Sequence, residues 1–148
     1  MSVSDPQREM ASAVLELLSN SPPVAEDDSG AVQVFDSKVD GSPTAWAVFY
    51  LQRLLNGARM TSGAAQIDWL LTVHSVGEDV FQARAISERV NQRLAPFGGP
   101  SVRLAVEGWE SSPIRPVDSD GADFDRDTDP APAFVVDQFR WRSDRRVT

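Results

Sequence analysis

The chain has 148 residues, one histidine, no cysteine and a formal net charge of −8 at pH 7. A chain of this length fits one domain, residues 1 to 148, that buries about 70% of its unfolded surface, and the missing cysteine excludes disulfides, thiolate metal sites and cysteine nucleophiles. The negative charge excludes a general binder of duplex DNA, because phosphate neutralisation needs a basic surface.

Residues 5 to 19 have the pattern of an amphipathic helix. Asp5 can cap the first turn, and Pro6 suits the first helical position, where no amide hydrogen is needed. The apolar residues at helical spacing are Met10, Val14, Leu17 and Leu18. The prolines that follow end the helix, since proline cannot continue the hydrogen-bond ladder.

Two strands are expected next, at residues 32 to 36 and 45 to 53, with a turn-rich loop between them. The second strand, AWAVFYLQR, is apolar on both faces over most of its length and is therefore expected to lie inside the sheet. Residues 54 to 66 are polar and small and lead into another strand, so the sequence predicts a long hairpin with a projecting tip. Loop tips of this kind often make contacts.

The third strand is expected at residues 66 to 76, and it carries the only histidine. By the two-residue period of a strand, Trp69 and Leu71 lie on one face, and His74 lies on the other, more polar face. A catalytic histidine would need a nucleophile and an orienting carboxylate beside it. Because Ser75 points to the opposite face, the two neighbours cannot form a direct dyad, and we expect His74 to be part of the scaffold or of an interface.

The second helix has the clearest pattern in the chain. Its apolar residues recur at spacings of three and four, and they are Ala83, Ile86, Val90, Leu94 and Phe97. Two overlapping capping boxes can start the helix, Ser75 with Glu78 and Asp79 with Gln82. Gly77 permits a close turn from the strand into the helix, and the Gly-Gly-Pro stretch after the last apolar residue ends it.

The last third of the chain is expected to hold two strands and two charged segments. Residues 101 to 110 alternate, with Val102, Leu104 and Val106 inward, and residues 134 to 143 form the closing strand. Residues 118 to 129 hold six aspartates and one arginine, which gives −5 of the net −8, and they are expected to form an acidic loop. Residues 140 to 148 are expected to form a basic C-terminal tail.

The acidic loop offers hard oxygen ligands that could hold calcium. These aspartates are Asp118, Asp120, Asp123, Asp125, Asp127 and Asp129. The register of an EF-hand loop fails, because Gly121 falls two positions early and no glutamate closes the loop, so a solvated loop is the favoured interpretation. The sequence also has no phosphate-binding glycine loop and no GxSxG motif, so we predict no metal, no cofactor and no catalytic residue.

The order of elements predicts an α+β fold. We expect a single mixed, mainly antiparallel β-sheet with two helices packed on it and a long projecting β-hairpin. The sequence has no secretory signal at its start and no apolar run near the ~18 residues that cross a bilayer, so a soluble protein with no membrane partner is expected.

Three segments resemble the tail terminator, or tail-completion, proteins of long-tailed bacteriophages. They are VFDSKVDGSPTAWAVFYLQ at residues 34 to 52, LLTVHSVGEDVFQARAISERVNQRL at 70 to 94, and FVVDQFRWRS at 134 to 143. In order, they give a strand, a turn and a strand, then a strand before a helix, and then a closing strand. With the N-terminal helix, the resemblance covers most of the chain, and none of the three segments is a chemical signature.

The resemblance implies a homohexameric ring at the head-proximal end of the virion tail, made in the host cytoplasm. Such a ring stops polymerisation of the tail tube and docks onto the neck of the head, so its partners are the major tail tube protein and the head-completion, or stopper, protein. Genomic DNA passes through the channel without specific binding. These proteins are not enzymes. Another head–tail connector or neck ring protein remains an alternative, and a small hydrolase or calcium-binding module that uses His74 or the aspartates is a further one.

If the ring exists, two groups of residues are candidates for function. The aspartates of residues 118 to 129 are expected to face the channel, where like-charge repulsion keeps DNA from sticking. The candidate contacts to neighbouring subunits or to the tube are Asn56, Arg59, Met60, Arg140 and Arg142.

Overall fold

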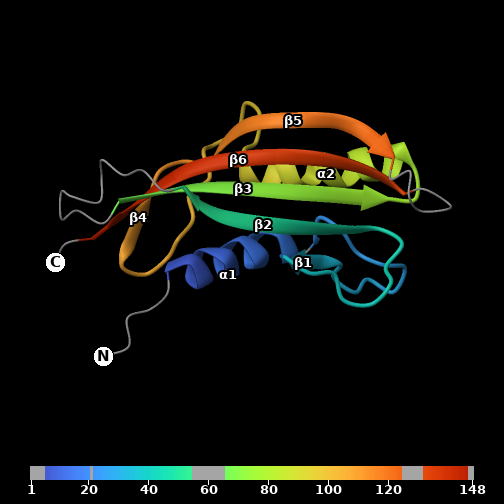
Figure 1. The fold of residues 1–148 in the computed structure, drawn as a ribbon, viewed down its shortest axis with the longest axis horizontal. Coiled ribbons are helices and arrows are strands. Elements are labelled where there is room, and N and C mark those ends of the chain that lie inside the picture. Colours follow the sequence, from blue (N-terminus) through green and yellow to red (C-terminus); the bar gives the residue numbers. More distant parts are fainter. Residues whose placement is uncertain (1–5, 21, 55–65, 125–131, 147–148) are drawn as a thin grey trace.

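The structure is a computed structural model and describes residues 6 to 20, 22 to 54, 66 to 124 and 132 to 146. The two helices are α1 (Pro6–Ser19) and α2 (Val80–Leu94). The strands are β1 (Val34–Asp36), β2 (Trp46–Leu54), β3 (Gln66–Gly77), β4 (Trp109–Ser111), β5 (Arg115–Phe124) and β6 (Ala133–Arg145) (Figure 1). Within the described residues, neither helix is long and apolar enough to cross a membrane.

The strands form one mixed sheet in the order β1-β2-β3-β6-β4, and β5 also pairs with β6. β1 and β2 are parallel, and all the other strand pairs are antiparallel. The two long strands β3 and β6 pair over twelve positions, from Gln66 opposite Asp144 to Gly77 opposite Ala133. The predicted α+β fold with a mainly antiparallel sheet is therefore confirmed, and the tip of the predicted hairpin, at residues 55 to 65, lies outside the described residues.

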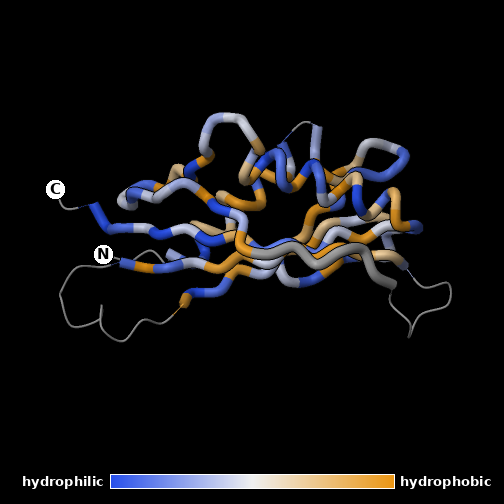
Figure 2. Tube along the Cα trace, turned by 90° about the horizontal axis from the view of Figure 1, so that it is seen from above, coloured by the Kyte–Doolittle hydropathy of each residue, from blue (hydrophilic) through white to orange (hydrophobic). Residues whose placement is uncertain are grey.

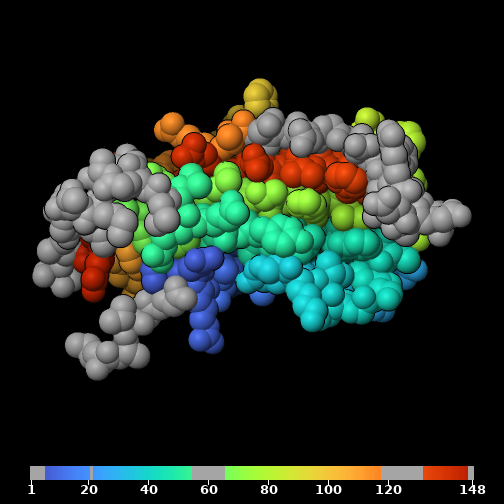
Figure 3. Space-filling view, viewed as in Figure 1, coloured from blue at the N-terminus to red at the C-terminus, as the bar shows by residue number. Residues whose placement is uncertain are grey.

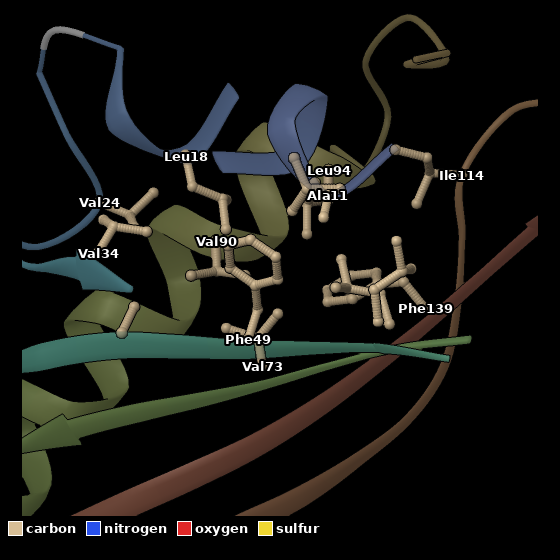
Figure 4. Close-up of a cluster of buried hydrophobic side chains, with 14 of the residues drawn as sticks. Ala11, Leu18, Val24, Val34, Phe49, Val73, Val90, Leu94, Ile114 and Phe139 are labelled. Carbon is tan, nitrogen blue, oxygen red and sulfur yellow. The ribbon is translucent and has the colours of Figure 1, made fainter. Parts of the chain in front are cut away.

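Both helices pack on the same face of the sheet, so the core is a single layer between helices and strands (Figures 1 and 2). In the close-up of this layer, Phe49 and Phe139 rise from the strands toward Leu18, Val90 and Leu94 of the helices (Figure 4). The side chains of Phe49, Phe139, Leu18 and Leu94 have no exposed surface. The apolar alternation of the strands and the helical spacing of α1 and α2 therefore meet in one core, as the sequence pattern predicts.

The start of α2 has the predicted Asp79 cap, and the Gln82 side chain bonds the amide one residue before that cap. The Asp79 side chain accepts a hydrogen bond from the Gln82 amide at 2.8 Å, and the Gln82 side chain accepts one from the Glu78 amide at 2.7 Å. Ser75 is fully buried in β3, two residues before the strand ends, so the predicted Ser75–Glu78 box does not form. The strand continues through Gly77 because its ladder with β6 extends to that residue.

Phe97 is a second correction to the helix prediction. It shares the helical spacing of the buried residues of α2, but the helix ends at Leu94 and Phe97 is fully exposed. Pro96 follows the C-cap residue Ala95, and a proline one or two residues after a helix end prevents the helix from continuing. Phe97 is therefore carried out of the apolar stripe into a turn at the surface.

Residues 101 to 110 do not form the predicted strand, and only Trp109–Ser111 pairs with β6. The alternation is nevertheless real, because Leu104 is buried and Val102 and Val106 pack against the core. The segment thus covers the core as an extended chain without a ladder partner. A period of two predicts which side chains point inward, and it does not show that a neighbouring strand exists.

The described parts of the two charged segments near the C-terminus, residues 118 to 124 and 140 to 145, lie in strands, so the predicted loop and tail are wrong for these residues. Residues 115 to 124 form β5, which pairs with β6 through two register shifts, one after Pro116 and one after Asp120. The shifts explain why no strand was predicted, because proline, glycine and five polar residues in this stretch hide the two-residue period. Residues 140 to 145 continue β6 and pair with β3, β4 and β5, so this part of the predicted tail is ordered sheet.

Candidate interaction surface

One face of the sheet carries no helix. Its side chains alternate with the buried ones along each strand, and Figure 3 looks onto this face, where β2, β3 and β6 lie at the surface. The partly or fully exposed residues of this face, here called the open face, include Tyr50, Gln52, Leu70, Thr72, His74, Val136, Gln138 and Arg140. Antiparallel sheets commonly leave one face to solvent, and this face is therefore accessible for contacts.

His74 lies in the middle of the open face, as predicted. Its ring meets the Tyr50 ring edge-on, with the centroids 5.5 Å apart and the planes at 74°. Ser75 points to the covered face and is fully buried, so the structure confirms that the two residues do not form a dyad. Desolvation by partial burial lowers the pKa of His74 below its ordinary value of 6.5, because the charged ring loses more hydration than the neutral one.

The lowered pKa of His74 predicts a pH dependence of stability that a His74→Gln variant should lose. The unfolded chain binds a proton at its ordinary pKa, above the pKa of the folded chain, so the wild-type stability is fully present above pH 6.5 and falls as the pH drops toward the folded-state pKa. Urea unfolding of both proteins across this pH range measures the effect. An identical slope in both proteins would show that His74 does not contribute.

A buried polar cluster lies on the covered face, between α2 and the sheet. The Ser87 hydroxyl donates a 2.5 Å hydrogen bond to Oδ2 of Asp137, a carboxylate that is 1% exposed. Asp137 Oδ1 and the hydroxyl of Ser75 have no hydrogen-bond partner among the described residues. Sequence reasoning did not find this cluster, because an aspartate in an alternating strand is normally assigned to the solvent side. Its closed position between helix and sheet suits a structural role and offers no access to a substrate.

Arginines gather at one corner of the sheet, where β5 begins. Arg115 lies directly opposite Arg140 on the neighbouring strand, and Arg142 follows two residues along on the same face. Arg142 forms an ion pair with Asp68, with 3.5 Å between Nε and Oδ1. Arg115 and Arg140 form no ion pair with any residue whose side chain the structure describes. Two like charges directly opposite each other are unfavourable within one subunit. We call Arg115, Arg140 and Arg142 the basic corner.

An acidic turn stands at the opposite edge of the sheet, just before β1. The Asp27 side chain accepts hydrogen bonds from the Ser29 hydroxyl at 2.6 Å and from the Ser29 and Ala31 amides at 2.9 Å. The hydrogen bond from the Ser29 side chain, followed by that from the Ala31 amide, holds the pKa of Asp27 below its ordinary value of 3.8. Glu26 and Asp28 are exposed on either side. These three residues, Glu26, Asp27 and Asp28, are called the acidic turn.

The predicted site residues are only partly described. Arg140 and Arg142 lie on the open face, and the backbones of Asp118, Asp120 and Asp123 lie in β5, opposite Gln138, Val136 and Phe134. The predicted residues outside the described part of the chain are Asn56, Arg59, Met60, Asp125, Asp127 and Asp129. Among the described residues, no three histidine, aspartate or glutamate side chains come together in a way that could hold a metal ion.

Sequence reasoning missed Arg115 and the acidic turn. Arg115 carried no signal because its segment was not expected to be a strand, and only pairing with β6 places it beside Arg140. The acidic turn lies between the first helix and the first predicted strand, and a short charged stretch of this kind is ordinarily a solvated loop. Both features depend on which strands lie at the edges of the sheet.

Comparison with known proteins finds matches among solved structures. No protein-family model and no curated protein matches the sequence. Among solved structures, the chain is similar to a chain of the "Virion of native gene transfer agent (GTA) particle", with a TM-score of 0.67 and 13% sequence identity. The match covers 95% of this chain and 99% of that chain. At this identity, the similarity establishes a shared fold over nearly the whole of both chains.

Proposed function

We propose that this chain is a structural protein of a phage-like virion, a tail terminator that forms a hexameric ring at the head-proximal end of the tail. In this role the ring caps the tail tube and joins it to the neck of the head. Its partners are the major tail tube protein and the head-completion protein. The protein acts through complementary surfaces and carries out no chemical reaction.

The observation that carries the proposal is the full-length fold similarity to a chain of a gene transfer agent virion. The three sequence segments that resemble tail terminators form β1 to β3, α2 and β6 of this same fold. The open face and the two charged edges give the subunit surfaces for neighbours, and Ser75, the residue next to the one histidine, is buried on the opposite face of the sheet.

The aspartate-rich segment has a place in the proposed ring. Residues 118 to 129 carry −5, and their first part forms the outer strand β5. We propose that this segment faces the central channel, where negative charge repels DNA phosphate within about 10 Å at moderate salt. DNA would then pass through the ring without binding to it.

The experiment that tests the function is electron microscopy of particles from cells in which this gene is deleted. A missing terminator should leave tubes of uncontrolled length and heads without tails, because nothing stops polymerisation or presents a surface to the neck. Complementation with the wild-type gene is the control, and a tagged copy should appear as a ring at the head-proximal end of the tail.

Two other outcomes have definite meanings. Tubes of normal length that do not join heads would assign the chain to another neck ring protein. Complete, infectious particles in the deletion strain would contradict a structural role in the tail.

A further inference from the structure

The basic corner and the acidic turn of one subunit cannot neutralise each other. The acidic turn leads into β1, whose Val34 is aligned through β2 and β3 with Val135 of β6, five residues from Arg140. With about 3.3 Å per residue and about 4.8 Å between strands, Val34 and Arg140 are offset by about 16 Å along the strands and about 14 Å across three strand spacings, and Arg115 lies one spacing further out. This separation exceeds the Debye length of about 8 to 10 Å, so each group keeps its charge unbalanced by the other.

Both groups stand at outer edges of the sheet. The acidic turn is closed by the hydrogen bond from the Asp27 amide to the Ala31 carbonyl and by the bridge between Glu26 and Val32, which holds its carboxylates at the β1 edge. The basic corner is at the start of β5, which pairs only with β6 among the described strands. The subunit therefore presents two arginines at the start of β5, before the aspartates of that strand, and exposed carboxylates at the diagonally opposite edge.

We propose that the acidic turn of one copy of this chain docks against the basic corner of the next copy. The contact joins the β1 edge of one sheet to the β5 edge of its neighbour, with the Glu26 and Asp28 carboxylates accepting hydrogen bonds from the Arg115 and Arg140 guanidinium groups. Because the two surfaces differ, the contact is head-to-tail, and such contacts repeat until a ring closes. The inference rests on the proposed function in that it names the surfaces by which the ring subunits meet.

The partner at this surface is a second copy of the chain, because the charges of the basic corner and the acidic turn are opposite in sign and equal in number. Two arginines without an ion pair among the described side chains meet two exposed carboxylates that also have none. The like-charge pair Arg115 and Arg140 is unfavourable in the free subunit, and carboxylates from a neighbour remove that repulsion. Asp27 is occupied by the hydrogen bonds that shape the turn, so the contact relies on its two neighbours.

The test uses the fact that the natural chain contains no cysteine. A double variant, Asp28→Cys with Arg140→Cys, places one thiol at each surface, and a short bis-maleimide should link copies into a ladder of dimers, trimers and larger species. Each single variant can give no more than dimers. A matched pair, Asp28→Cys with Arg84→Cys, replaces an exposed arginine of α2 and should give no ladder. The reaction is run on the purified chain and on intact particles.

Charge reversal supplies the second measurement. Arg140→Glu should weaken self-association about tenfold, and Arg140→Glu combined with Asp28→Arg should restore it, because the attraction is re-formed with the signs exchanged. The single variant should also unfold at a slightly higher temperature than the wild type, since it turns an arginine pair into an opposite-charge pair. Weaker association of a more stable subunit cannot be explained by misfolding.

Several results would overturn the inference. They are an equal ladder from the matched pair, no loss on charge reversal, no recovery in the double variant, and no ladder in either sample. The Arg140→Glu variant could instead bind a short DNA duplex more weakly while its self-association stays unchanged. That result would show that the basic corner binds DNA phosphate and not a second copy of the chain. The proposed function is tested separately: rings seen in particles that give no ladder would end this inference alone, and normal tails in the deletion strain would end the function.

Discussion

A Phe139→Ala variant is expected to lose about 3 to 5 kcal/mol of folding free energy. Phe139 is fully buried in the layer between the sheet and both helices, so the deletion removes buried apolar contacts and leaves a cavity (Figure 4). Domains are stable by about 5 to 15 kcal/mol in total, so a loss of this size removes a large share of the stability and should clearly lower the denaturation midpoint. Chemical denaturation, with the midpoint and the slope fitted separately, measures it.

The matched control for this prediction is Phe134→Ala. Phe134 lies on the same strand, five residues away, and its side chain is on the open face and partly exposed. Its loss should cost less than half as much, because a partly exposed ring transfers less apolar surface out of water. Equal losses for the two variants would contradict the assignment of the core to the helix-covered face.

Gly77→Ala is expected to destabilise the chain by about 1 to 3 kcal/mol, the usual range for an overpacked site. A Cβ atom added at Gly77 would lie 2.7 Å from the Ala83 amide nitrogen and 2.9 Å from the Gln82 Cβ. Neither atom can move without shifting the first turn of α2, and that turn is fixed by the Asp79 cap. The loss should appear both in the unfolding midpoint and as faster hydrogen exchange in the first turn of α2.

Gly99→Ala is the control for the Gly77 variant. A Cβ at Gly99 would meet only the Pro96 side chain, at 3.1 Å and 3.3 Å, in an exposed turn. This turn can adjust, so the cost should be well below that at Gly77. A Gly77→Ala protein as stable as the wild type would show that the strand-to-helix junction is looser than its contacts indicate.

Long, regular elements were predictable because their periods are unbroken. The residues of β3 alternate between buried and half-buried from Asp68 to Ser75, and the apolar stripe of α2 runs from Ala83 to Leu94, so both elements and most of their buried faces follow from the sequence. β5 was not predictable in this way. Its strand depends on a partner, β6, that is long enough to pair with it across two register shifts.

The candidate surfaces were predictable only where one strand carries the signal. Arg140 and Arg142 alternate with the buried Phe139 and Trp141 within β6, so their common face is visible in the sequence. The basic corner also contains Arg115, which lies on a different strand. The acidic turn becomes a candidate surface only because it lies at the other edge of the sheet. Relations of this kind between edges are set by topology, and no local pattern of residues encodes them.

The buried carboxylate of Asp137 fixes the position of α2 on the sheet through its hydrogen bond with Ser87. The Ser87 hydroxyl reaches Oδ2 in only one rotation and one axial position of the helix. A shift of the helix by one residue or one turn would leave a buried polar group without a hydrogen-bond partner. Apolar side chains alone tolerate such slides, because leucine packs nearly as well on several neighbours. We therefore expect this one buried contact to select a single packing arrangement of α2 on the sheet. Each copy of the subunit would then have the same shape.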